Sequence, residues 1–240
     1  MKAWYSKNPA LLQEIKTQIE AAYPELHLSV EGGIVRVQGS LFIRNPTTHE
    51  EIDRFSIEIE FPEDFPASIP IVRETAGRIP RLPDRHFNGE DACLFVPDER
   101  YKYYPRDATI VDFIQGPVTK FFAWQISYDL HGGLDRIGHR AHGTPGIIEF
   151  YSEVLQTDDV NVIIRFLTFL SKDEIKGHWE CYCGSGRILR KCHFELLKGW
   201  RQMILEKYAA SSLRRIQEHV IHNQGIQSGA SERVPDLPGR

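Results

Sequence analysis

Apolar residues recur every three to four positions in residues 8–22, behind an Asn8 that can cap a helix, and this spacing predicts an amphipathic helix. Apolar and polar residues then alternate one by one, in two runs within residues 26–37 and in a third run at residues 55–61. Alternation of this kind predicts strands with one buried face. A short apolar run at residues 69–73 completes a predicted four-stranded antiparallel meander.

The periodicity changes after the meander. Residues 76–106 hold four prolines and little periodicity, so we expect an irregular but ordered segment. Helical spacing returns at Asp107, a candidate N-cap, and Gly116-Pro117 is expected to interrupt the helix that follows. Helices are predicted at residues 107–128, 146–155 and 159–171, and one more after residues 181–193 that continues to about His219.

The composition is that of a globular, core-forming protein. Of the 240 residues, 41% are hydrophobic and 26% are charged, and a formal net charge of −4 gives no case for nucleic acid as a partner. No apolar run approaches the roughly 20 residues that span a bilayer, and the first residues, MKAWYSKNPALL, lack the pattern of a secretory signal. We therefore expect a cytoplasmic protein, free of membrane spans, whose reduced cysteines serve as metal ligands or as a nucleophile.

Three of the four cysteines are crowded into one short segment. ECYCGSGRILRKCHFE, residues 180–195, holds Cys181, Cys183, Cys192 and His193. Three thiolates and one imidazole form a complete tetrahedral zinc set, and because protein fills all four positions the zinc is expected to be structural. The alternative is a coincidental group of reduced thiols. The segment closely resembles the SEC-C motif, a small zinc-binding module found at the ends of bacterial proteins.

The fourth cysteine, Cys93, lies alone in HFNGEDACLF, residues 86–95, after a polar turn that contains a glycine. An isolated cysteine is most often a small buried hydrophobe. Its thiolate is also a strong nucleophile and a good leaving group, so that a reachable cysteine can carry an acyl group as a thioester. Both interpretations are open from this segment by itself.

Two further motifs favour the second interpretation. FPEDFPASIPIV, residues 61–72, resembles the FP-x-x-YP-x-x-PP-x-V signature of ubiquitin-conjugating enzymes, with Phe65 in place of the tyrosine and Ile69 in place of one proline. That family follows its signature with a His-Pro-Asn element, a glycine and the active Cys-Leu pair. This chain has His86-Phe87-Asn88-Gly89 and then Cys93-Leu94. HGTPGIIEFY, residues 142–151, is similar to segments of bacterial members of the family found in antiphage-defence operons.

The resemblance implies an α+β fold of the ubiquitin-conjugating-enzyme type (UBC fold), with an N-terminal helix, the four-stranded meander and C-terminal helices. It makes Cys93 the thioester-forming residue and assigns Asn88 to the oxyanion or to loop stabilisation. His86 is expected to support the loop, with general-base duty as the alternative. This chain departs from the family in Phe87, which replaces a proline, and in Asn88, which lies only five positions before the cysteine (93 − 88).

The function implied by the resemblance is that of a ubiquitin-conjugating-like acyl carrier in bacterial antiphage defence, CBASS-like or related. Cys93 would accept the C-terminus of a ubiquitin-like protein, or of an operon partner such as a nucleotidyltransferase that makes cyclic oligonucleotides, and pass it to an amine. The chain has no Gly-rich phosphate loop, so an activating enzyme is a further expected partner. The alternative is a catalytically inactive UBC-fold scaffold, recruited through its zinc module. A third hypothesis, zinc-dependent binding of nucleic acid, is supported only by the basic residues near the module.

The expected domains are a ubiquitin-conjugating-enzyme-like catalytic domain at residues 1–157, a helical region with the SEC-C zinc module at residues 158–222, and a disordered polar tail at residues 223–240.

Some remaining residues admit two interpretations each. The tyrosines of DERYKYYP could line an acceptor groove or pack the irregular segment, and the basic residues after the module could meet an acidic partner or solvent. The histidines invite a second metal site, although loop packing is the simpler reading. The histidines are His131, His139, His142 and His178. The basic residues after the module are Arg201, Lys207, Arg214 and Arg215.

Overall fold

The computed structural model describes residues 3–133 and 140–230. The chain divides into two compact units, residues 1–142 and residues 143–240, and each is described by itself. The division falls before the helix at Thr144–Leu155, whereas the sequence pattern placed the end of the first domain after it.

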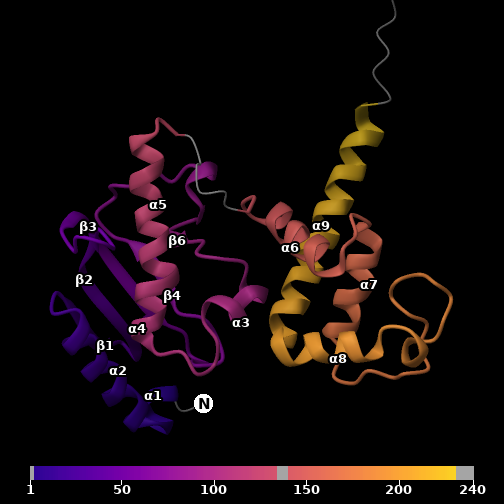
Figure 1. The fold of residues 1–240 in the computed structure, drawn as a ribbon, viewed down its shortest axis with the longest axis horizontal. Coiled ribbons are helices and arrows are strands. Elements are labelled where there is room, and N and C mark those ends of the chain that lie inside the picture. Colours follow the sequence, from indigo (N-terminus) through magenta and orange to yellow (C-terminus); the bar gives the residue numbers. More distant parts are fainter. Residues whose placement is uncertain (1–2, 134–139, 231–240) are drawn as a thin grey trace, which may run out of the picture. The chain divides into compact units, whose positions relative to one another are not determined.

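A mixed α+β architecture with an antiparallel sheet forms the first unit (Figure 1). The predicted meander is present as β1 (Leu26–Glu31), β2 (Ile34–Arg44), β3 (Glu51–Phe61) and β4 (Ile71–Glu74). The sheet has six strands in the order β1-β2-β3-β4-β6-β5, because two short strands that the sequence pattern did not predict extend it. These strands are β5 (Phe87–Asn88) and β6 (Asp91–Ala92), and they lie within the segment expected to be irregular.

Helices complete this unit and cover one face of the sheet. After the short α1 (Trp4–Lys7), the predicted first helix is confirmed as α2 (Pro9–Ala22), and the Asn8 side chain accepts a hydrogen bond from its first turn. Helix α5 (Thr119–Leu130) lies across the sheet (Figure 1). Its Phe122 packs on Phe55 of β3 with ring centroids 4.7 Å apart. The shared interior of α2, α5 and the sheet forms one hydrophobic core.

The helix expected from Asp107 onward begins later and is interrupted as predicted. Thr109, not Asp107, is its N-cap, because Thr109 and Asp112 form a reciprocal capping box at the start of α4 (Ile110–Phe113). A π-helical segment that contains Pro117, Ile114–Val118, then separates α4 from α5. Proline lacks the N–H that an α-helix needs at an interior position, which accounts for the interruption. The segment before these helices also holds α3 (Arg100–Tyr103).

The second unit is a helical assembly that carries the cysteine-rich segment. Its helices are α6 (Thr144–Leu155), α7 (Val160–Leu170), α8 (Phe194–Met203) and α9 (Glu206–Ala230). Phe150, Phe166, Leu197 and Ile216 from the four helices are all buried. The single helix predicted after the cysteines is in fact two, because Ile204 adopts an extended conformation between α8 and α9 and is itself buried.

The end of the chain also differs from the expectation. The tail predicted from residue 223 begins inside α9, which continues to Ala230. Residues 231–240 lie outside the described residues. None of the described helices combines the length and the apolar character that a membrane span requires.

Candidate functional site

Cys93 follows a tight hairpin made of β5 and β6. Asn88 pairs with Asp91 across a two-residue turn, and Gly89 in this turn has a φ of 62°, as type II′ hairpins require at their first central position. The ladder continues beyond the strands, because the backbone N–H of Cys93 donates to the carbonyl oxygen of His86 at 2.8 Å. Cys93 is partly exposed, so the structure does not bury it in the core as an isolated cysteine often is.

The hairpin register relates Asn88 to Cys93. Since Asn88 is opposite Asp91, it is the diagonal cross-strand neighbour of the residue two positions further on, which is Cys93. Diagonal neighbours in an antiparallel pair lie roughly 7–8 Å apart. The five-residue spacing therefore brings the two residues near each other through the turn.

His86 occupies the position opposite Cys93 in a strained backbone conformation. Its φ is 54°, in the left-handed region that non-glycine residues rarely adopt. The imidazole ring packs edge-on against Trp124 of α5, with centroids 5.1 Å apart, and lies 5.8 Å from the ring of His142. These contacts are those of a residue that supports the hairpin, and they place His142 on the same side of the unit.

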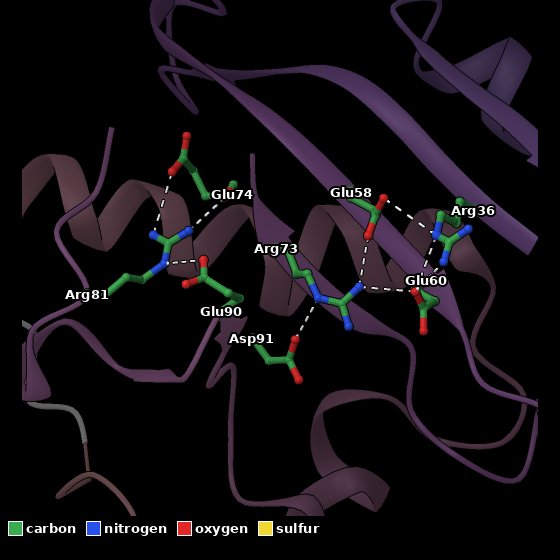
Figure 2. Close-up of polar contacts among 8 residues, drawn as sticks. All are labelled: Arg36, Glu58, Glu60, Arg73, Glu74, Arg81, Glu90 and Asp91. Atoms are coloured by element: carbon green, nitrogen blue, oxygen red, sulfur yellow. Dashed lines mark hydrogen bonds and ion pairs between the residues drawn. The ribbon is translucent and has the colours of Figure 1, made fainter. Parts of the chain in front are cut away.

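Arginine 73 links the hairpin to the centre of the sheet. It lies on β4 directly opposite Asp91, and its Nε donates to that carboxylate at 2.7 Å (Figure 2). On its other side Nη1 donates to Glu58 at 2.8 Å and to Glu60 at 3.1 Å. Burial lowers the pKa of Arg73, but the hydrogen bonds to the three carboxylates outweigh burial and raise it. The row of charges therefore fixes the position of β6.

Arginine 81 holds the other side of the hairpin. Its Nε donates to Glu90 in the turn at 3.0 Å, and its guanidinium lies over the ring of Phe87 at 4.1 Å. A further nitrogen donates to the backbone carbonyl of Glu74 at 2.8 Å, and Figure 2 shows the guanidinium between Glu74 and Glu90. The carboxylate of Glu74 is buried, where it also accepts backbone N–H groups from Ala76 and Arg78.

The two arginines change the interpretation of the acidic residues beside Cys93. Glu90 and Asp91 lie close to Cys93 in the sequence, where a carboxylate could receive a proton from an attacking amine, but each is engaged by an arginine. The oxygens of each carboxylate are thus already occupied by a charge-assisted hydrogen bond. The geometry therefore favours a structural role for both residues.

Cys181, Cys183, Cys192 and His193 are brought together in the second unit. Their ligand atoms all lie within 4.8 Å of one another, which is close enough to hold a metal ion. The sulfurs of Cys183 and Cys192 are 3.6 Å apart, and Nδ1 of His193 lies 3.3 Å from the sulfurs of Cys181 and Cys192. In a tetrahedral site with zinc–sulfur bonds of about 2.3 Å, sulfurs lie roughly 3.8 Å apart. The donor set and its spacing fit zinc.

The backbone around the cluster forms a second small hairpin. Glu180 bridges Ile188, and the N–H of Cys181 donates to the carbonyl of Arg187 at 2.9 Å. Burial raises the pKa of Cys181 to about 11. Burial also opposes ionisation of Cys183, but hydrogen bonds from the side chain and backbone of Ser185 outweigh it and lower that pKa to about 6. A metal ion would favour the thiolate of every cysteine in the set.

The remaining ligands lie at the start of a helix. His193 is the N-cap residue of α8 and Cys192 directly precedes it, so these two ligands lie at the N-terminal end of the helix. Between the first two cysteines, the buried ring of Tyr182 packs at a tilt on His193 at 5.3 Å and edge-on against Phe166 of α7 at 5.0 Å. Arg165 of α7 donates to the carbonyl of Tyr182 at 2.8 Å. The cluster is thus built into the core of the second unit.

The other sequence candidates separate into packing residues and surface residues. Tyr104 is buried against Phe113 with centroids 4.7 Å apart, so it packs the core, whereas Tyr103 stacks on Phe95 near the surface. His131 bonds its own helix through the carbonyl of Ser127. His139 lies outside the described residues, and within the described ranges the Cys₃His set is the one group of this kind. Sequence reasoning missed Arg73 and Arg81, because their partners are distant in the chain.

A scan against protein-family models finds no match for this chain. A search of the curated proteins finds no match either.

Proposed function

We propose that the first unit is a ubiquitin-conjugating-like acyl carrier that forms a thioester at Cys93. The observation that carries the proposal is the hairpin: it presents a partly exposed thiol opposite His86, with Asn88 diagonal to it. Two arginines hold this hairpin in place, so the thiol has a defined position. A carrier needs such a position because productive transfer depends on the orientation of the reacting groups.

The acyl group is transferred in two steps. The thiolate of Cys93 attacks the carbonyl carbon of an incoming thioester, a new carbon–sulfur bond forms, and the donor thiolate leaves. An amine then attacks the Cys93 thioester, a carbon–nitrogen bond forms, Cys93 leaves as a thiolate, and the ammonium proton passes to water. The incoming thioester supplies the driving force, so Cys93 needs only weak activation.

Asn88 is the candidate donor for the oxyanion in both steps. An acyl group on Cys93 would lie in the gap between the two side chains, where the Asn88 amide could donate to the carbonyl oxygen. Asn88 is exposed, so its side chain is accessible to an approaching acyl group. His86 is assigned to hairpin support, since its ring packs on Trp124.

We further propose that Cys181, Cys183, Cys192 and His193 hold a structural zinc ion. The support is the fit of four donors to a tetrahedron, with no position left for substrate. The zinc would supply folding energy to the second hairpin, and Tyr182 would join that hairpin to α7. The nature of the modifier, the acceptor amine and the bacterial defence context stay proposals that rest on the family resemblance.

The carrier proposal is tested with the full chain and a peptide thioester of mercaptoethanesulfonate that ends in Gly-Gly. Mass spectrometry is expected to find one acyl adduct on Cys93, which hydroxylamine removes. Cys93→Ser is the matched control, because an ester at serine resists thiols and forms far more slowly. Asn88→Ala is expected to slow transfer to free lysine by about 10²-fold, the order that loss of an oxyanion donor costs.

The alternative, an inactive scaffold with the same fold, predicts a different result. Cys93 in the folded chain would give no adduct, while the same residue would react after denaturation. That outcome would remove the carrier proposal and leave the scaffold. Retention of zinc by Cys93→Ser would show that the second unit was intact in either case.

A further inference from the structure

The peptide group that joins Tyr182 to Cys183 is hydrogen-bonded on both sides. Its carbonyl oxygen accepts a hydrogen bond from Nε of Arg165 at 2.8 Å. Its N–H, which belongs to Cys183, donates to the sulfur of Cys181. One peptide group therefore connects a guanidinium on α7 to the buried sulfur of the Cys₃His set.

The planarity of this peptide group couples the two hydrogen bonds. The C=O and the N–H of a trans peptide lie in one plane and point in opposite directions. A guanidinium that fixes the oxygen of Tyr182 therefore also fixes the direction of the Cys183 N–H. The charged donor at the oxygen polarises the amide as well, and hydrogen bonds in such a chain strengthen one another.

The sulfur of Cys181 is the ligand for which this contact matters most. Cys181 is 2% exposed, whereas Cys183 and Cys192 are partly exposed. A buried thiolate has little access to water, so its hydrogen bonds must come from the protein. The N–H of Cys183 supplies one of them.

Arg165 reaches the turn from outside the cysteine-rich segment. It lines one groove together with Cys181, Tyr182 and Gly184. A Cβ built on Gly184 would lie 3.4 Å from Nη2 of Arg165, so the guanidinium lies close against the turn. The next residue of α7, Phe166, contacts the ring of Tyr182. Helix α7 thus holds Tyr182 by its backbone as well as by its side chain.

We propose that Arg165 is a positioning residue for the metal: its Nε orients the peptide group whose N–H points at the sulfur of Cys181. The inference rests on the proposed zinc site. Outer-shell partners of this kind orient a metal ligand, and their loss typically costs about 10–100-fold in metal affinity. Arg165 lies outside residues 180–195, so the spacing of the cysteine motif does not reveal it.

Three variants of the full chain, purified with zinc, separate the hydrogen bond from charge and packing. Arg165→Met removes the donor and the charge, while Arg165→Gln keeps an N–H donor at the position of Nε and removes only the charge. Lys172→Met is the matched control. Lys172 lines the same groove, but its ammonium lies 4.6 Å from the Trp179 ring and has no contact with Tyr182 among the described residues.

Competition with a chromogenic chelator measures the zinc affinity. We expect Arg165→Met to bind one zinc with an affinity at least about 10-fold lower, and the other two variants to stay within about three-fold of the parent chain. Loading with Co²⁺ gives a second readout, because the thiolate-to-cobalt charge-transfer bands report on the sulfurs themselves. These bands should move to longer wavelength in Arg165→Met and stay in place in Arg165→Gln, whereas a mere loss of stability would not move them.

Unchanged zinc affinity and unchanged cobalt bands in Arg165→Met would overturn the inference and leave the zinc site in place. An equal loss in Arg165→Gln and Arg165→Met would also overturn it, because the charge and not the donor at Nε would then be responsible. A parent chain that binds neither metal would instead refute the zinc site on which the inference rests.

Discussion

Arg73 and Asp91 form an ion pair of 2.7 Å that joins the middle of the sheet to the strand leading into Cys93. The two residues are 18 positions apart, and they lie directly opposite each other on β4 and β6. The pair therefore determines where the last hairpin sits. If Cys93 carries an acyl group, the position of that group depends on a contact with no chemical role of its own.

Arg73→Met is expected to loosen the hairpin because it leaves Asp91, Glu58 and Glu60 without their shared cation. We expect a loss of about 1–2 kcal/mol of stability in the first unit. Hydrogen exchange followed by mass spectrometry should show faster exchange in residues 86–93. Arg36→Met is the control, since among the described residues Arg36 pairs with Glu58 and Glu60 but not with Asp91. Equal exchange in both variants would contradict a specific role for Arg73.

Cys181→Ser is expected to remove zinc from the purified chain. The affinity should fall by more than the roughly 10–100-fold that follows from losing a residue that only orients a ligand. Metal analysis should find about one zinc per parent chain and far less in the variant. Cys93→Ser should retain the full equivalent, because Cys93 belongs to the other unit. A full equivalent in Cys181→Ser would refute the four-ligand site.

Acid is expected to weaken the first unit through Glu60. Burial raises the pKa of Glu60, but hydrogen bonds from Arg73 and Arg36 outweigh burial and hold that pKa below its ordinary value of 4.5. A carboxyl group whose pKa is lower in the folded than in the unfolded state stabilises the fold at any pH above its unfolded-state pKa. This stability is lost as the pH falls through the folded-state pKa. In Glu60→Gln, the free energy of unfolding measured with urea should fall less steeply with decreasing pH below about pH 4.5. An unchanged acid slope would show that other groups dominate.

Gly39→Ala is expected to be among the most damaging small substitutions. Gly39 has a φ of 143°, and an added Cβ would lie 1.9 Å from the backbone carbonyl oxygen of Glu25. The added Cβ and the Glu25 oxygen can separate only if β1 or β2 moves. We therefore expect the free energy of unfolding to fall by about 3 kcal/mol or more. Gly116→Ala is the control in the same unit, because its Cβ would meet nothing within 4 Å. Thermal unfolding of both variants measures the difference.

The local pattern of the chain was sufficient for several parts of the structure. Alternation predicted β1 to β3, and the three-to-four spacing predicted α2, α6 and α7, because burial of one face imposes a period on the sequence. A short apolar run predicted β4. The Cys₃His set was predicted for a similar reason. Its ligands all lie within residues 181–193, so their spacing along the chain already limits their spacing in space.

Other features were decided only by tertiary structure. The β5–β6 hairpin is too short to show a period, and it exists because it adds to β4 and is held by Arg73 and Arg81. The break at Ile204 reflects burial in the second unit, which no helical pattern records. Cys93 was identified as a candidate from its motif, but its exposure and its neighbours His86 and Asn88 follow from strand pairing. Contacts between distant residues leave no periodic trace in the sequence, and so the arrangement around the thiol required the folded chain.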